Sequence, residues 1–443
     1  NVHDPSCCKL GDYYYMYSTD AILGENRKEA EEKNVPLGFI QVRRSKDLVK
    51  WEFIGWAFPE IPHEAVEWVR SHADGKGATN IWAPYIIPFG DKYRLYYCVS
   101  AFGLKTSYIG LAESASPEGP WMQRGCVVKT DATSVMNAID PSIIADSATG
   151  KWWMHYGSFF GGLYCVELNP ETGLPVQEGD QGHLIARRAT YWKDNLEAPE
   201  IIYNPELKQY YLFVSYDPLM TTYNVRVGRS DKAEGPFVDY FGVELKNTTN
   251  NFPILTAPYR FNNHPGWAGT AHCAVFTSDE GQYFMAHQGR LSPHNQMMDL
   301  HLRQVFFTSD GWPVVSPERY TGSASRKFSA ADIVGEWEII RVQEPAYERQ
   351  LQAGQILWGE GQLKNEEWNV SCTLSLKKDG QLDENKGYWK FAERGQLLSL
   401  TLNGESVDNL LVFAGHDWEN ETETVLFTGL DSRGRSVWGK RTK

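Results

Sequence analysis

Three acidic residues stand at the starts of similar segments that lie far apart in the chain. Asp4 and Asp140 each begin an Asp-Pro-Ser motif, and Glu197 directly precedes Ala198-Pro199. Carboxyl groups that meet in one pocket can hydrolyse an acetal, because one protonates the leaving oxygen while another activates water. A neighbouring negative charge raises the pKa of the proton donor. The residue types therefore predict hydrolytic chemistry, provided that the fold brings them together.

Five similar segments would position these residues. Each has a two-residue start, a short apolar strand, a turn and an aromatic strand, which together predict a β-hairpin, and a second hairpin usually follows. Four antiparallel strands repeated five times predict an all-β, five-bladed β-propeller. A large β-sandwich is the alternative, but it would not produce registered starts. The starts are Asp4-Pro5, Ala83-Pro84, Asp140-Pro141, Ala198-Pro199 and Ala271-His272.

The register of the repeats relates the acidic residues to one another. Asp4 and Asp140 occupy the same position, Glu197 lies one residue earlier, and His272 takes the position of the prolines. If the first strand of every blade is innermost, all four side chains lie at one level of the central channel. A single Asp before a proline is more often a turn or a strand-start cap than a catalytic group. Two aspartates in one repeat position, with a glutamate in a third blade, favour catalysis.

Two insertions interrupt the pattern around the first blade. Residues 21–37 are charged and compatible with a helix, and residues 59–79 contain a helical turn around HEAVEWVRSHAD. We expect both to form loops over one face of the propeller, where substrate contacts are usually placed.

The composition of the chain limits which classes of partner and which cellular locations are expected. The formal net charge of −13 argues against nucleic acid and against a polyanionic polymer, so a neutral polymer is expected. No stretch of about 18 apolar residues encodes a membrane span. The seven cysteines lack metal-ligand spacing and predict small, mostly buried residues without a disulfide framework. The start at Asn1, in a strand approach, predicts that a signal peptide was removed from a secreted, periplasmic or cell-surface bacterial protein, which we expect to be a monomer.

The repeat pattern ends near Arg319, and the length of 443 residues suggests a second domain. We predict a propeller domain over 1–320, a linker with a short helical turn over 321–332, and a smaller antiparallel β-barrel or sandwich over 333–443. Its tryptophans are expected in the core and not on a binding platform. They are Trp337, Trp358, Trp368, Trp389 and Trp418.

Several motifs together resemble one known family. They are HDPS at His3–Ser6, IWAP at Ile81–Pro84, NAIDPS at Asn137–Ser142, YGSFFGG at Tyr156–Gly162 and LEAPE at Leu196–Glu200. This set is similar to motifs of glycoside hydrolase family 43. The NAIDPS and YGSFFGG pair, with LHLRQVFFTSDGWPVV from Leu300, resembles its endo-α-1,5-L-arabinanases. The resemblance covers residues 1–320 and implies endo-hydrolysis of α-1,5-linked arabinan or arabino-oligosaccharides.

The resemblance also implies roles for the acidic residues. Asp4 would be the general base, Glu197 the general acid, and Asp140 the group that raises the pKa of the acid and orients it. The family inverts the anomeric centre in a single displacement, so the base and the acid are expected roughly 6.5–9.5 Å apart. Glu200 competes for the acid role, but it is offset by three positions from Glu197 and ranks below it.

A histidine and several polar or aromatic residues complete the expected site. A lone histidine beside a strand is usually structural, but the resemblance implies a hydrated calcium ion near His272, beneath the catalytic centre. One imidazole with waters is an unusual shell, since calcium prefers oxygen ligands. His287 and Asn80 are weaker candidates for sugar contacts. The main candidates, each with a core, turn or ion-pair alternative, are Trp82, Asn137, Ser158, Phe159 and Arg290.

Two alternatives to an endo-arabinanase remain at this point. An exo-acting α-L-arabinofuranosidase or a β-xylosidase would keep the same mechanism on the same fold, with a closed pocket in place of a groove. A non-catalytic carbohydrate-binding propeller belongs to another class. It would be expected to lack a carboxylate at one of the registered positions, and this chain lacks none.

Overall fold

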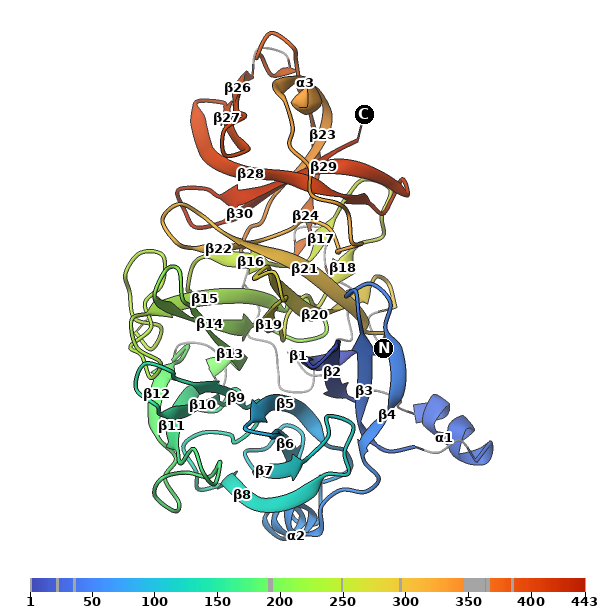
Figure 1. Ribbon diagram of the computed structural model, residues 1–443, viewed down its shortest axis with the longest axis vertical. Coiled ribbons are helices and arrows are strands. Elements are labelled where there is room, and N and C mark those ends of the chain that lie inside the picture. Colours follow the sequence, from blue (N-terminus) through green and yellow to red (C-terminus); the bar gives the residue numbers. More distant parts are fainter. Residues whose placement is uncertain are drawn as a thin grey trace.

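The computed structural model describes residues 2–20, 24–34, 37–189, 194–247, 250–294, 297–345, 363, 367–383 and 386–442. β-sheets build almost all of this structure (Figure 1). Small sheets surround a common centre, and a curled sheet formed by the C-terminal residues caps them at the top of the view (Figure 1). Within the described ranges, no helix is long and apolar enough to cross a membrane.

Four of the small sheets are separate, and each contains four antiparallel strands in chain order. This is the arrangement that two consecutive hairpins per repeat predict. The first two sheets are β1 (His3–Leu10), β2 (Tyr13–Thr19), β3 (Phe39–Ser45) and β4 (Glu52–Phe58), and β5 (Trp82–Phe89), β6 (Lys92–Ser100), β7 (Ser107–Ser114) and β8 (Met122–Thr130). The next two are β9 (Ser142–Ala145), β10 (Trp152–Tyr156), β11 (Leu163–Leu168) and β12 (His183–Ala186), and β13 (Leu196–Asn204), β14 (Gln209–Tyr216), β15 (Asn224–Ser230) and β16 (Ile254–Thr256).

The fifth repeat is not a separate sheet. β19 (Ala274–Thr277), β20 (Tyr283–Leu291), β21 (Asp299–Phe307) and β22 (Pro313–Val315) pair in order, but β20 also pairs with β18 (Trp267–Ala268). β18 pairs with β17 (Tyr259–Arg260), which pairs in parallel with β24 (Asn369–Val370). The fold is therefore propeller-like, as expected, but the count of five separate blades is not confirmed. β20 runs past the end of β19 and joins a larger, seven-stranded sheet.

The first strands of the repeats surround the centre. β1 contacts β5 and β19, β9 contacts β5 and β13, and β13 contacts β19, so these strands close a ring. Sheets that pack face to face bury both faces of their middle strands. β7 is accordingly buried along its whole length. Within this sheet, Gly110 lies directly opposite Tyr97 on β6, and a Cβ atom at Gly110 would lie 2.3 Å from the Tyr97 ring.

A bulge recurs at the start of the inner strands. The pairing register shifts within His3–Ser6 in β1, within Trp82–Tyr85 in β5 and within Glu197–Glu200 in β13. Left-handed backbone at a non-glycine residue costs about 1–2 kcal/mol, and a bulge re-aims side chains. Neighbouring positions can therefore face the same channel, although they would face opposite sides of a regular strand. The left-handed residues of the ring, with φ from 38° to 58°, are Asp4, Ala83, Asp140, Ala198 and His272.

These left-handed residues correct the predicted register of the fifth repeat. His272 occupies the position of Asp4 and Asp140, and not the position of the prolines. Its backbone N–H donates to Ser215 Oγ on the preceding sheet (2.9 Å), as the N–H of Asp140 donates to Cys98 Sγ (3.2 Å). The sequence alignment matched Ala271 with the alanines of the Ala-Pro starts. Because no proline follows at this start, the sequence did not show that the match was wrong by one residue.

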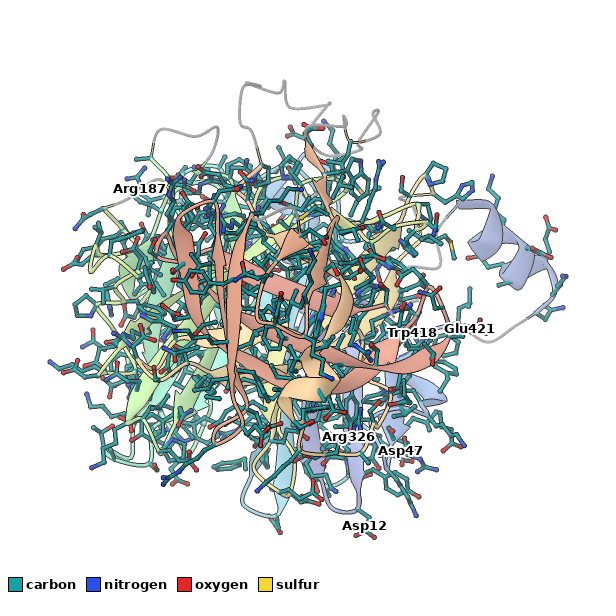
Figure 2. All side chains as sticks on the ribbon, turned by 90° about the horizontal axis from the view of Figure 1, so that it is seen from above. Asp12, Asp47, Arg187, Arg326, Trp418 and Glu421 are labelled. Carbon is teal, nitrogen blue, oxygen red and sulfur yellow. The ribbon has the colours of Figure 1, made fainter. Side chains whose placement is uncertain are left out.

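Both insertions contain helices. α1 (Gly24–Glu32) lies within 21–37 and stands away from the rest of the molecule (Figure 1, Figure 2). α2 (His63–His72) lies within 59–79 and packs Ala65 and Val69 against the second sheet. α3 (Ala330–Ile333) is the short turn expected in the linker, and a capping box between Ser329 and Asp332 holds it.

The C-terminal residues form a second, antiparallel sheet. It contains β25 (Cys372–Leu376), β23 (Gly335–Arg341), β30 (Ser436–Arg441), β29 (Thr422–Leu430), β28 (Glu405–Asp417), β27 (Leu397–Leu402) and β26 (Gly387–Ala392), in this order. Isolated bridges join Leu376 to Leu382 and Gln381 to Tyr388, so a short link connects the two edges of the curled sheet. The sheet encloses its own apolar core around Trp337.

The tryptophan and cysteine predictions hold for most of the described residues. Trp337, Trp368 and Trp389 are buried, Trp358 lies outside the described residues, and Trp418 is 37 % exposed on the surface (Figure 2). All seven cysteines are free, as expected, and Cys372 is exposed.

Candidate active site

The residues that the repeat register singled out line one pocket. Asp4, Asp140, Glu197 and His272 all border this pocket, whose volume is about 400 Å³. Asp4 and Glu197 lie on inner strands at bulges, and Asp140 lies two residues before the inner strand β9. We call Asp4, Asp140 and Glu197 the pocket carboxylates.

Asp4 is held as a carboxylate by two histidines and a hydroxyl. Thr19 Oγ1 donates to Asp4 Oδ2 at 2.7 Å, and His3 Nδ1 lies 2.8 Å from the same oxygen. His272 Nδ1 lies 2.9 Å from Oδ1. Burial by itself would raise the pKa of Asp4, but the charges and hydrogen bonds of the two imidazoles bring it well below its usual value. Asp4 is thus ionised at neutral pH.

Asp140 has the opposite electrostatic environment. Burial raises the pKa of Asp140 well above its usual value, His272 opposes the rise, and the negative charges of Glu197 and Asp4 add to it. The two aspartates occupy the same repeat position, but their pKa values are shifted in opposite directions. This separation is the arrangement by which one carboxyl can hold a proton beside another that stays charged.

Glu197 is half-buried, and each of its carboxylate oxygens accepts a hydrogen bond. Tyr223 Oη donates to Oε1 and Ser158 Oγ donates to Oε2, both at 2.7 Å. Ser158 also forms an isolated β-bridge with Glu197, which ties the two blades together at this point. The carboxylate is therefore fixed in orientation while it still faces the pocket.

His272 meets one requirement of the cation that the resemblance implies. Its Nδ1 is bonded to Asp4, and metal-binding histidines usually present one ring nitrogen to a carboxylate and the other to the metal. Burial lowers the pKa of His272, but Asp4 and the other pocket carboxylates raise it to about 9, so the ring carries a second proton. A cation would take the place of that proton. Because His272 supplies a single ligand atom, such an ion would have to be largely hydrated.

The five main candidates for sugar contacts all line the pocket, as does the weaker candidate Asn80. Trp82 is half-buried and meets the 46 % exposed ring of Phe102 edge to face. Arg290 is buried and donates through Nε to Leu219 O at 3.1 Å. His287 does not line the pocket, because it is buried on the other side of β20, where its Nε2 accepts from Arg303 Nε at 3.0 Å.

Glu200 lies outside the pocket lining, in agreement with its lower rank. Its Oε2 accepts from Ser142 Oγ at 2.8 Å and its Oε1 accepts from the backbone N–H of Val275 at 2.9 Å. It therefore links three neighbouring inner strands below Asp140 and His272. Burial raises the pKa of Glu200 to about 7.

Sequence reasoning missed Tyr223 and Thr19, which contact the pocket carboxylates. Thr19 lies at the end of the second strand of the first repeat, opposite His3, and Ser215 is its counterpart in the fourth. A comparison of second-strand ends across the repeats would have found Thr19. Tyr223 directly precedes β15, the third strand of the fourth repeat, and the sequence comparison of the repeats covered only the starts of the first strands.

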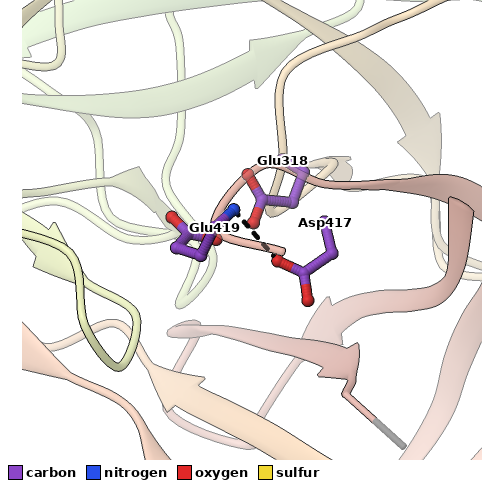
Figure 3. A group of neighbouring side chains, drawn as sticks. All are labelled: Glu318, Asp417 and Glu419. Atoms are coloured by element: carbon purple, nitrogen blue, oxygen red, sulfur yellow. Dashed lines mark hydrogen bonds between the residues drawn. The ribbon is translucent and has the colours of Figure 1, made fainter. Parts of the chain in front are cut away.

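A second group of three carboxylates lies between the propeller-like part and the C-terminal sheet (Figure 3). Glu318, Asp417 and Glu419 form this acidic cluster. Among the described residues, it is the one set of acidic, His or Cys side chains close enough together to hold a metal ion. Lys440 Nζ already occupies it, 2.9 Å from Glu318 Oε1 and 3.0 Å from Asp417 Oδ1, and it is also paired with Glu419.

Comparison with known families covers nearly the whole chain. Glycosyl hydrolases family 43 matches residues 1–313. A C-terminal lipocalin-like domain that accompanies this family matches residues 317–439.

Individual relatives are similar over most of their length. An extracellular endo-α-(1→5)-L-arabinanase of Thermotoga petrophila is 29% identical over 100% of this chain and 94% of its own. An extracellular exo-α-(1→5)-L-arabinofuranosidase of Cellvibrio japonicus is 30% identical over 74% of this chain and 90% of its own. The crystal structure of the endo-1,5-α-L-arabinanase from Thermotoga petrophila RKU-1 has a TM-score of 0.81 and 28% identity, and the match covers 100% of this chain and 98% of that chain.

Proposed function

The chain belongs to glycosyl hydrolases family 43, and on this premise we propose that it cleaves α-1,5-L-arabinofuranosidic bonds within arabinan. The observation that carries the proposal is a single pocket bordered by Asp4, Asp140 and Glu197, with opposite pKa shifts on the two aspartates. The relative similar over the full chain is named an endo-arabinanase. A net charge of −13 suits a neutral polymer.

In the proposed reaction Asp4 is the general base. Its low pKa keeps it ionised, and it takes a proton from the water that attacks the anomeric carbon. Glu197 is the general acid and protonates the leaving oxygen. Asp140 is its modulator, since burial and the neighbouring charge of Glu197 raise the pKa of Asp140 well above its usual value.

A direct attack by water predicts inversion at the anomeric carbon. Proton NMR during the first turnovers of an arabino-oligosaccharide would detect the anomer that forms first. The β-anomer is expected. Early accumulation of the α-anomer would require a covalent intermediate and would contradict the assigned roles.

Product sizing after brief digestion of linear arabinan tests endo action. A ladder of oligosaccharides is expected at the earliest times. Arabinose alone from the start would instead support the exo-acting alternative, which one relative's name favours. Release of xylose from aryl β-xylosides, with no action on arabinan, would support a β-xylosidase.

We further propose that a hydrated calcium ion binds at His272. Its charge would hold water and Asp140 in place beneath the site. Elemental analysis of protein purified without added calcium should find one equivalent in the wild type and much less in His272→Ala. Wild-type protein without a bound divalent ion would refute this proposal.

The division of the chain is also a proposal. We propose that β19–β22 act as the fifth blade, and that the propeller domain (1–320) and a C-terminal barrel (333–443) meet through the linker at 321–332. The two family matches, which divide between 313 and 317, support this boundary. The relatives named extracellular support export. We also propose that the enzyme is a monomer and that arabinan is its partner.

A further inference from the structure

We propose that Tyr223 is a positioning residue that decides which oxygen of Glu197 carries the proton transferred to the leaving group. The inference rests on the proposed function, because it assigns the mechanism of the same acid. It gives the Tyr223 hydroxyl a role that is separate from packing, and it assigns the transferable proton to Glu197 Oε2.

The two hydroxyl partners of Glu197 differ in what they can do. Tyr223 Oη donates to Oε1, and burial together with the charge of Glu197 raises the pKa of Tyr223 well above its usual value, so the phenol keeps its proton. An oxygen that accepts this hydrogen bond is not the one that is protonated. Ser158 lies on Oε2. Both hydroxyls can donate and accept, but a phenol is the stronger donor and the weaker acceptor, because its oxygen lone pair is delocalised into the ring. The proton of the acid therefore resides on Oε2, where Ser158 can accept it in a hydrogen bond.

The backbone holds Tyr223 in place independently of Glu197. Its N–H donates to Pro218 O at 3.1 Å, and its carbonyl accepts from Thr270 N–H at 3.2 Å. The side chain is 1 % exposed and packs in the apolar core behind the pocket. The phenol thus keeps its position when the charge on Glu197 changes.

One buried ion pair connects the backbone near Glu197 with the backbone near Tyr223. Arg188 Nη1 donates to Asp217 Oδ1 at 2.8 Å and to the carbonyl of Asn195 at 3.0 Å. Asn195 lies two residues before Glu197, and Asp217 begins the loop that ends at Tyr223. The pair is nearly inaccessible to water, with side chains 2 % and 3 % exposed, and it ties the two backbone segments to each other.

The chemistry follows from this assignment. As the glycosidic C–O bond breaks, the proton passes from Glu197 Oε2 to the leaving oxygen, and water forms the new bond to the anomeric carbon and gives its proton to Asp4. Glu197 is left as a carboxylate. Donors aimed at a charge that develops during the reaction stabilise the transition state more than the ground state. Tyr223 is such a donor.

Other charged groups also surround Glu197. Asp140 faces it from the third repeat and Asp4 from the first, while His272 faces it from the fifth. Arg290 lies near Tyr223 and Asp4. All of these are retained when only the Tyr223 hydroxyl is removed, so a change in the titration of Glu197 in that variant reports the lost hydrogen bond.

Tyr223→Phe tests the inference. On arabinan we expect kcat to fall about 10–100-fold with little change in KM, because the lost bond strengthens in the transition state. The basic limb of the kcat/KM profile should move to higher pH by about one unit, since a carboxylate without a donor is a weaker acid. The loss should shrink on aryl arabino-oligosaccharides with acidic phenols as leaving groups, which need no proton.

Tyr96→Phe is the matched control. Tyr96 is also buried, its hydroxyl donates to the backbone carbonyl of Gly173 at 3.0 Å, and it does not line the pocket. This variant loses a buried hydroxyl too, yet it should keep the pH profile and the leaving-group dependence of the wild type. A Tyr223→Phe variant with equal losses on all leaving groups and an unmoved basic limb would show a purely structural role.

NMR titration of ¹³C-carboxyl-labelled glutamates separates this inference from the proposed function. The Glu197 signal, assigned with Glu197→Gln, should titrate at higher pH in Tyr223→Phe than in the wild type, whatever polymer the enzyme cleaves. An unchanged titration in folded protein would overturn the inference even if arabinan is the substrate. A shifted titration in a protein without action on arabinan would overturn only the proposed substrate.

Discussion

This chain contains two groups of three carboxylates, and the two groups differ in whether a cationic side chain lies between their members. The acidic cluster surrounds Lys440, which is fully buried and pairs with all three members. The pocket carboxylates border a cavity of about 400 Å³, and His272 contacts only Asp4 among them. The first group is compensated by an internal cation. The second keeps Asp140 and Glu197 without a cationic partner of their own in the described contacts, and a substrate can reach them.

The comparison teaches that a count of converging carboxylates does not identify a catalytic site. Repulsion among buried carboxylates can be relieved by a cation, by protonation or by access to water. The acidic cluster uses Lys440, and Glu318 within it has a pKa raised to about 8 by burial. Burial raises the pKa of Asp140 well above its usual value, and Asp140 borders an open pocket. It is this second group that a ligand in the pocket can contact.

The largest expected effect separates the two groups by activity. Glu197→Gln should lower kcat on arabinan about 10²–10⁴-fold, because the amide cannot donate the proton. Glu419→Gln, the matched change in the acidic cluster, should leave kcat unchanged. Initial rates of reducing-sugar release, with circular dichroism to confirm folding, measure both. Full activity in Glu197→Gln would refute its role as the acid.

Changes in the acidic cluster should affect the free energy of unfolding and not the activity. Lys440→Met leaves two buried carboxylates and a half-buried one without their cation, which should cost about 3–5 kcal/mol of the free energy of unfolding. Urea denaturation would measure this loss. Lys151→Met is the control, since Lys151 pairs with Glu167 on the surface at 2.9 Å, and such pairs contribute about 0–1 kcal/mol. Equal midpoints for the two variants would contradict the structural role of the acidic cluster.

Glu200 provides a smaller, pH-dependent test of a buried carboxyl without a cation. Its pKa rises from 4.5 to about 7 on folding because of burial, so the folded protein binds the proton more tightly. The stabilising effect is complete below pH 4.5, is lost as pH rises toward 7, and amounts to roughly 3 kcal/mol. Glu200→Gln should remove it.

Thermal unfolding of both proteins between pH 4 and 8 checks this prediction. The difference in Tm, variant minus wild type, should rise over that interval and then level off. Glu60→Gln, at an exposed position outside the pocket, should show no such trend. A constant difference for Glu200→Gln would mean that folding does not change the pKa of Glu200.

The smallest effect concerns the wall of the open pocket. Trp82→Ala removes an aromatic face from the pocket and should raise KM for arabinan up to about 10-fold with a smaller change in kcat. Phe53→Ala is the control, because this ring is 45 % exposed on β4 and does not line the pocket. Michaelis–Menten kinetics on linear arabinan compares them. An unchanged KM in Trp82→Ala would place the sugar elsewhere.

The register of the repeats predicted which strands surround the channel. It also predicted that Asp4, Asp140 and Glu197 lie at that channel. It succeeded because equivalent positions of repeated units face the same direction. It failed by one residue at His272, where the fifth repeat has no proline to mark the bulge. It also failed to show that β20 would continue past β19 into a larger sheet, because that pairing depends on C-terminal residues far along the chain.

The residue types and their spacing determined the all-β class, the inner strands and the three candidate carboxylates, since these follow from local patterns that repeat. The tertiary structure decided how each carboxylate behaves. The same Asp-Pro-Ser motif gives Asp4 a lowered pKa and Asp140 a raised one, because two imidazoles contact the first while burial near Glu197 dominates the second. Tyr223 and Lys440 reach their carboxylates from distant segments. Their roles depend on distances between elements, which no local pattern in this sequence encodes.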